Sequence, residues 1–184
     1  MKNLNKLIVF VLLAGICGTV SAQNFKFGHI NAQELIMLMP ERDSAIVKME
    51  NYGKELQEQV ETMQVEFNNK MTVYQSKQAT WTAAILEQKQ KELQELTQRI
   101  GEFEQTAQQD FQNMQRMLLA PVMEKANNAV KKVGKDNAFT YVFDISTGVL
   151  PYFNEDQSID ILPLVKKELG IPADKKLPTQ SAAR

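Results

Sequence analysis

The chain has 184 residues and carries 21 Lys and Arg, 22 Asp and Glu and one His, which gives a net charge of −1. This length is enough for one domain, and the near-neutral charge argues against nucleic acid as a partner. The only cysteine is Cys17. If the N-terminal segment is removed on export, the remaining chain has neither a disulfide nor thiol chemistry.

The first 22 residues have the composition of an export signal. Lys2 and Lys6 precede an apolar run over residues 7–16, and Val20-Ser21-Ala22 supplies small residues at the cleavage spacing. We therefore predict a signal peptide over residues 1–22, cleaved between Ala22 and Gln23. The mature chain then has 19 Lys and Arg against 22 Asp and Glu, a net charge of −3.

Two other interpretations of this segment stay open. The apolar run of ten residues is too short to span a bilayer as a helix, which argues against a retained membrane anchor. A lipoprotein modified at Cys17 would need a small residue before the cysteine, whereas Ile16 is bulky.

Residues 23–40 are short and apolar, and we assign them to a small β body. Phe25–Ile30 combines aromatic and β-branched side chains, which is typical of a strand. Asn31 and Glu34 have the spacing of a capping box, so they predict a short helix that stops before Pro40.

Residues 41–134 form a long polar segment with the pattern of a coiled coil. Between residues 41 and 120 there is no proline, and 14 of the 80 residues are glutamine. A narrow apolar seam runs through the first half with a mean spacing of 3.5 residues, formed by Ile46, Met49, Tyr52, Leu56, Val60, Met63, Phe67, Met71 and Tyr74. A seam at this period is typical of helices that supercoil.

One helix of this length would extend about 140 Å at 1.5 Å per residue, so we predict a hairpin instead. Ala79-Thr80-Trp81-Thr82 are weaker helix formers near the middle of the segment, and Thr82 is suited to begin the second helix. We place the tip within residues 75–86, which gives an antiparallel coiled coil with arms of about 60–70 Å. Gly53 and Gly101 interrupt the arms, and we predict that they act as hinges.

Residues 135–171 complete the predicted β body, and residues 172–184 form a loose tail. Three strands are predicted, at Phe139–Phe143, Val149–Phe153 and Ser158–Ile161. Pro151 places the second of these at a sheet edge. Pro163 then opens a short helix that Gly170 ends.

The order of these parts resembles the Skp/OmpH family. Three stretches carry the resemblance: residues 27–35 in the first strand and helix, residues 118–144 where the second arm returns to the body, and residues 158–167 near the end. The resemblance spans residues 25 to about 169 and is more specific at the ends than along the arms, because any coiled coil resembles another.

The resemblance implies an α+β homotrimer of the periplasm, a helical hairpin on a small β body that assembles by oligomerisation. Its arms would enclose unfolded outer-membrane proteins. Well-known members are strongly basic, whereas residues 41–120 here carry 9 Lys and Arg against 13 Asp and Glu, a net charge of −4. This charge argues against contact with lipopolysaccharide or anionic lipid.

No enzyme, cofactor or metal site is predicted. His29 is the only histidine and lies in a predicted strand, where a structural role is the usual one. With no cysteine beyond Cys17, a His/Cys metal cluster cannot form. The many carboxylates follow helix faces, where a solvated surface is the default, and a carboxylate enzyme is the weakest alternative.

The function that we predict is that of an ATP-independent holdase chaperone. Methionine is flexible and polarisable, so it adapts to varied partners, and a tryptophan at a hairpin tip is hard to bury. The predicted client contacts are Met63, Phe67, Met71, Trp81, Met114 and Met117. Alternatively, the methionines fill the seam and Trp81 packs on its own arm. A structural or adaptor coiled coil of the envelope is the alternative function.

Overall fold

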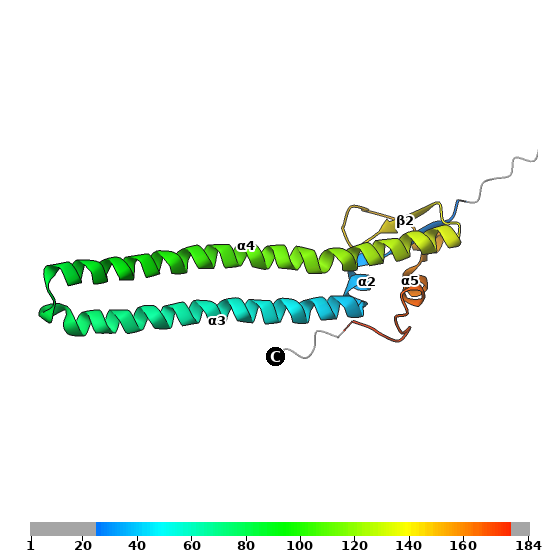
Figure 1. Ribbon diagram of the computed structural model, residues 1–184. Helices are drawn as coiled ribbons and strands as arrows, with labels where there is room; N and C mark the ends of the chain where they lie inside the picture. Colours follow the sequence, from blue (N-terminus) through cyan, green and yellow to red (C-terminus); the bar gives the residue numbers. More distant parts are fainter. Residues whose placement is uncertain (1–24, 178–184) are drawn as a thin grey trace, which may run out of the picture.

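The computed structural model describes residues 25–177, so the predicted signal peptide and its cleavage site at Ala22–Gln23 lie outside the described residues. A long helical hairpin projects from a small body that holds a three-stranded sheet and two short helices (Figure 1). Between residues 25 and 177, no helix is long and apolar enough to cross a membrane.

The hairpin consists of two long helices that lie side by side (Figure 1). Helix α3, Pro40–Lys77, has 38 residues and helix α4, Ala83–Asp136, has 54. At 1.5 Å per residue they extend about 57 Å and about 80 Å. The short 3-10 turn η1, Gln78–Thr80, joins them, and Thr82 occupies the N-cap of α4 without a side-chain capping bond.

The contact between the two long helices is a narrow seam. Few side chains along it are buried, namely Ala45 and Met63 of α3 and Leu93, Leu96 and Ala107 of α4. The other faces carry the glutamines and charged residues of the sequence. The arm therefore buries much less apolar surface per residue than a globular domain does, and the seam is the only apolar contact between its two helices along the described arm.

The sheet of the body is parallel and has the order β2-β1-β3. Its central strand β1, Phe27–Ile30, pairs with β2, Tyr141–Asp144, on one side and with β3, Ser158–Asp160, on the other. Helix α2, Ala32–Leu38, follows β1, and the Asn31 side chain accepts a hydrogen bond from the Glu34 amide at its start. Helix α5, Leu162–Glu168, follows β3.

One face of the sheet packs on the end of α4 and on α2 and α5. The core contains the following residues: Ile30, Leu35, Leu38, Met39, Val122, Ala126, Ala129, Val133, Ile161, Val165 and Ile171. Gly28 faces this core, where an added Cβ would lie 3.0 Å from the Phe139 ring and 3.1 Å from Ile161. Only glycine allows these two side chains to approach β1 so closely.

The predicted strand at Val149–Phe153 is wrong. This stretch is an irregular loop that ends at the 3-10 turn η2, Glu155–Gln157. Both edges of β1 are already paired with β2 and β3, and Pro151 has no amide proton to donate. Val149 and Tyr152 are 83% and 79% exposed, so their apolar side chains do not mark a buried strand face.

The chain beyond α5 folds back against the body. Lys166 is buried, and its Nζ donates to the carbonyl oxygens of Ala173 and Lys175, both at 2.8 Å. Lys175 also forms an ion pair with Asp43 of α3, at 3.6 Å. Residues 172–177 of the predicted loose tail therefore have specific contacts, while residues 178–184 lie outside the described part of the chain.

Candidate functional site

The predicted client-contact residues occupy three different environments in the arm. Met63 is buried in the seam, and Phe67, Met71 and Met114 are partly buried along it. Met117, near the base of α4, is 68% exposed. Seam filling therefore accounts for Met63, while Met117 is the residue of this set that presents an exposed apolar side chain.

Trp81 at the tip packs against its own arm. Its ring lies 6.0 Å from the Tyr74 ring, centroid to centroid, in an edge-to-face arrangement, and the side chain is partly buried. The Gln90 side chain of α4 in turn donates to the Tyr74 hydroxyl at 2.8 Å. These contacts close the hairpin at its distal end, and they leave part of the Trp81 surface accessible.

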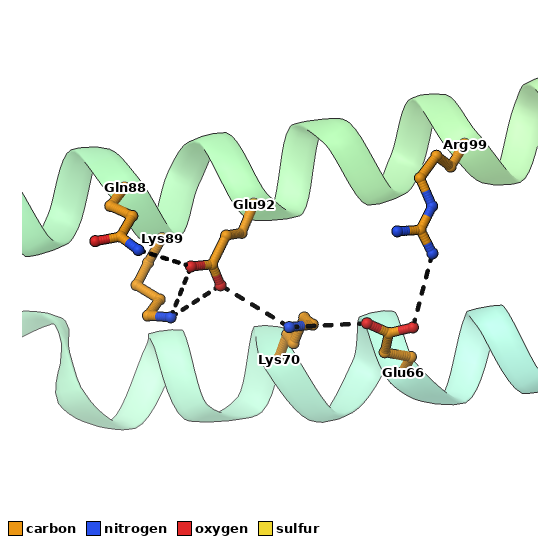
Figure 2. Close-up of polar contacts among 6 residues, drawn as sticks. All are labelled: Glu66, Lys70, Gln88, Lys89, Glu92 and Arg99. Carbon is orange, nitrogen blue, oxygen red and sulfur yellow. Dashed lines mark hydrogen bonds and ion pairs between the residues drawn. The ribbon is translucent and has the colours of Figure 1, made fainter.

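A network of charged side chains joins the two helices just below the tip (Figure 2). Lys70 of α3 approaches Glu92 of α4 at 3.8 Å, and Arg99 of α4 approaches Glu66 of α3 at 4.0 Å. Lys89 donates to both Glu92 carboxylate oxygens, at 2.9 and 2.8 Å. The hydrogen bond from Lys89 lowers the pKa of Glu92 below its ordinary value.

This network flanks the part of the seam where Met63, Leu93 and Leu96 are buried. The ion pairs are solvent-exposed, so each contributes little to stability, typically about 0–1 kcal/mol. Together they set the register of the two helices, because each pair is formed between particular turns. Beside the network lies a groove of about 210 Å³ whose apolar lining includes Val73, Tyr74 and Leu93.

The two predicted hinge glycines differ in their surroundings. An added Cβ at Gly53 would lie 3.2 Å from the Phe111 ring of α4, so the absence of a side chain lets this ring pack across the seam. At Gly101 nothing lies within 4 Å of an added Cβ. Gly53 therefore has a packing role, and Gly101 remains a predicted hinge without a contact of this kind.

The outer face of the sheet is rich in aromatic side chains, and within residues 25–177 several of them are exposed. Phe27 of β1 stacks with Tyr141 of β2 at 6.3 Å between ring centroids, and Tyr141 stacks with Phe143 at 6.0 Å. Phe25 continues the row at 6.4 Å from Phe27. Phe25 and Tyr141 are each 60% exposed. We call these four residues the aromatic face.

His29 lies on the same side of β1 as Phe27. Its Nδ1 lies 2.8 Å from the Ser158 hydroxyl, and its ring lies 4.7 Å from the Phe153 ring. These contacts fix the orientation of the imidazole within the body. Between residues 25 and 177 there is no group of three or more His, Cys, Asp or Glu that could hold a metal ion.

Charged contacts also anchor the base of the arm. Lys125 of α4 pairs with Glu41 at the start of α3, and the hydrogen bond from Lys125 lowers the Glu41 pKa. Lys132 pairs with Glu168 of α5 at 2.5 Å, and this hydrogen bond raises the Lys132 pKa. The two pairs tie α4 to the first turn of α3 and to α5.

Sequence reasoning missed the aromatic face and the exposed Met123 of α4. The aromatic residues occur two positions apart, at Phe25 and Phe27 and at Tyr141 and Phe143. This period of two places each pair on one face of a strand, and it was the signal in the sequence for an aromatic sheet face. Met123 is 52% exposed, six residues after Met117. The seam spacing includes Met63, but it does not show how exposed Met117 and Met123 are, because their exposure depends on which faces of α4 the rest of the fold covers.

Comparison with models of protein families matches residues 26–169 to the family described as outer membrane protein (OmpH-like). The matched stretch runs from the start of β1 to the end of α5 and so includes the whole hairpin and the whole sheet. No curated protein matches the chain.

Proposed function

Since the chain belongs to the family described as outer membrane protein (OmpH-like), we propose that it is an ATP-independent holdase chaperone of the periplasm. It keeps unfolded outer-membrane proteins from aggregating on their way to the outer membrane. The proposal includes export by the predicted signal peptide, an antiparallel coiled-coil arm, and no enzymatic activity or cofactor.

One observation carries this proposal, namely an arm of two long helices that extends away from the body (Figure 1). A narrow seam and exposed ion pairs join the two helices. Such an arm has no core to protect and exposes both polar and apolar side chains along its length. Several arms around one space would hold an unfolded chain through many weak contacts. No single residue would then dominate the binding.

Self-association into a homotrimer is the second part of the proposal, and the aromatic face supports it. A row of stacked rings of which Phe25, Tyr141 and Phe143 are exposed is unusual on a soluble monomer, where large exposed apolar patches mark interaction sites. The outer edges of β2 and β3 have no strand partner within the described residues. Unpaired edges of this kind are normally covered or paired with another chain.

Sedimentation of the mature protein at micromolar concentration tests the assembly. We expect about three chains per particle, and Tyr141→Lys should shift the mass to the monomer because it places a charge within the aromatic face. The matched control is Tyr152→Lys, since Tyr152 is 79% exposed and is not part of the stacked row. A wild-type protein that sediments as one monomer at every concentration would refute the trimer.

An aggregation assay tests the chaperone activity. A urea-unfolded outer-membrane β-barrel is diluted into wild type, into Trp81→Ala and into a form that lacks residues 63–98 and closes the arm with a short turn. This deletion removes the tip and every residue of Figure 2 except Arg99, and it leaves the body complete.

We expect wild type to suppress aggregation, the shortened form to lose this activity while keeping its mass, and Trp81→Ala to retain nearly all of it. Distributed binding predicts a cost of about 1 kcal/mol or less for one surface side chain. Full protection by the shortened form would show that the activity resides in the body. Complete loss in Trp81→Ala would show that the tip is a single dominant site.

A further inference from the structure

A groove of about 490 Å³ lies between the base of α3 and the base of α4. Its apolar lining consists of Ala45 from α3 and of Met117, Leu118, Pro121 and Val122 from α4. This volume falls within the range of pockets that bind ligands, which is about 300–1,000 Å³. Neither the groove beside the charged network of Figure 2 nor the aromatic face shares any of these residues.

Pro121 lies inside α4 and changes the chemistry of the groove. Proline has no amide proton, so the Met117 carbonyl four residues earlier loses its normal helical donor. Beside this carbonyl, the Met117 side chain is 68% exposed and adapts to partners of different shape. The groove thus combines an apolar lining with a backbone acceptor that lacks its helical partner.

The charges around the groove are unbalanced. Glu41 and Lys125 both line it and neutralise each other as an ion pair. Lys48 also lines it, and within residues 25–177 it forms no ion pair. The excess charge of the groove is therefore positive and sits at the Lys48 end, which complements an occupant with an acidic group.

The length of the groove limits what fits along it. The α3 residues extend from Glu41 to Lys48 and the α4 residues from Met117 to Lys125, about 10–12 Å along each helix. An extended polypeptide advances about 3.3 Å per residue, so three or four residues cover this length. Its backbone also supplies N–H donors, which a hydrocarbon chain does not.

We propose that this groove is a binding site for an extended segment of an unfolded polypeptide. The preferred segment has an apolar side chain over Ala45 and Val122 and an acidic side chain near Lys48. The site rests on the proposed chaperone function and gives it a defined location at the base of the arm, where a client is held in addition to the weak contacts farther out.

Fluorescence anisotropy with a labelled hexapeptide tests the site. The peptide alternates Leu and Thr, carries one Asp before its last residue, and has an amidated C-terminus. We expect Met117→Gln to weaken binding at least fivefold, because glutamine keeps the length of methionine but loses its apolar end. Met123→Gln is the matched control, since Met123 is an exposed methionine of α4 outside the groove, and it should change binding less than twofold.

The predicted contact between Lys48 and the acidic side chain of the peptide is tested by a double-mutant cycle. Lys48→Gln should weaken the Asp peptide at least threefold and should leave the corresponding Asn peptide unchanged. Lys54→Gln, on the same helix but outside the groove, is the control. Equal binding by wild type and Met117→Gln, or equal loss for the Asp and Asn peptides with Lys48→Gln, would overturn the proposal.

Two further results distinguish peptide binding in the groove from contact with a second copy of the chain, and the failure of this site from the failure of the proposed function. A change of sedimenting mass in Met117→Gln would overturn the proposal, because the groove would then be an interface between copies of the chain. Peptide binding with the expected dependence on Met117 and Lys48 supports the groove even if wild type fails to suppress aggregation, a failure that would refute only the chaperone function.

Discussion

Gly53 and Gly101 provide a matched test of how closely the two helices pack, because both lie inside long helices and only one faces a side chain. Alanine is more favourable than glycine in a helix interior by about 1 kcal/mol. At Gly101, where an added Cβ meets nothing within 4 Å, the full gain should appear. For a chain of this size it raises the melting temperature by about 2–4 °C.

Gly53→Ala should have a different outcome. The added Cβ would lie 3.2 Å from the Phe111 ring, and forcing an extra methyl group into a packed contact costs about 1–3 kcal/mol. The gain in helix propensity offsets about 1 kcal/mol of this, so the variant should be equal to wild type or up to about 2 kcal/mol less stable.

Thermal and guanidinium unfolding followed by circular dichroism, at one fixed protein concentration, measure both variants. Phe111→Leu in the Gly53→Ala background serves for a double-mutant cycle. Removal of the ring should restore the stabilisation that alanine gives at position 53. If Gly53→Ala stabilises the protein as much as Gly101→Ala does, the two helices are not in close contact at this position and the packing argument fails.

Three further predictions concern the body and the base of the arm. Pro121→Ala should restore the helical donor to the Met117 carbonyl and raise the free energy of unfolding by up to about 3 kcal/mol, as measured by guanidinium denaturation. Lys166→Met should lose the hydrogen bonds to Ala173 and Lys175, which should accelerate amide exchange in residues 171–177, whereas Lys167→Met, on the exposed side of α5, should not. Burial raises the Asp144 pKa, but hydrogen bonds from Ser146 and the Ala32 amide outweigh this effect and leave the pKa below 3.8. The contribution of Asp144 to stability is therefore fully present above the pKa of the unfolded state, and it is lost as the pH falls through the pKa of the folded state. Asp144→Asn should therefore be less stable than wild type at pH 7, with a difference that shrinks below about pH 4 in unfolding experiments; a constant difference down to pH 2 would contradict this cause.

The hairpin was predictable from the sequence because its signal is local. A seam with a mean spacing of 3.5 residues and a cluster of weak helix formers near its middle are enough to predict two long helices and a turn. The sheet was harder, since its contacts join distant residues: His29 and Ser158 are 129 positions apart, and Ala32 and Asp144 are 112 apart. Strand positions were partly predictable, but the order β2-β1-β3 was not.

The candidate sites were less predictable than the fold, for a reason that Met63 and Met117 illustrate. Both are methionines at helical positions of the arm, yet one is buried in the seam and the other is 68% exposed. Met63 lies in the seam that the 3.5-residue spacing predicts, but this spacing does not tell which residues outside the seam the rest of the fold covers. Val149–Phe153 was assigned wrongly for a similar reason, since an apolar composition does not reveal whether a partner strand is within reach.

The distribution of buried residues separates the tasks of arm and body. Val122, Ala126, Ala129 and Val133, near the end of α4, belong to the same core as the sheet, so the body anchors the second helix of the arm. Farther out, the helices are joined by a thin seam and by exposed ion pairs, which exchange readily for contacts with water. The arm can therefore change the separation of its helices at low cost while the core of the body stays intact. The chaperone function that we propose needs this combination, because clients differ in size, and the groove beside Pro121 lies where the rigid and the adaptable parts of α4 meet.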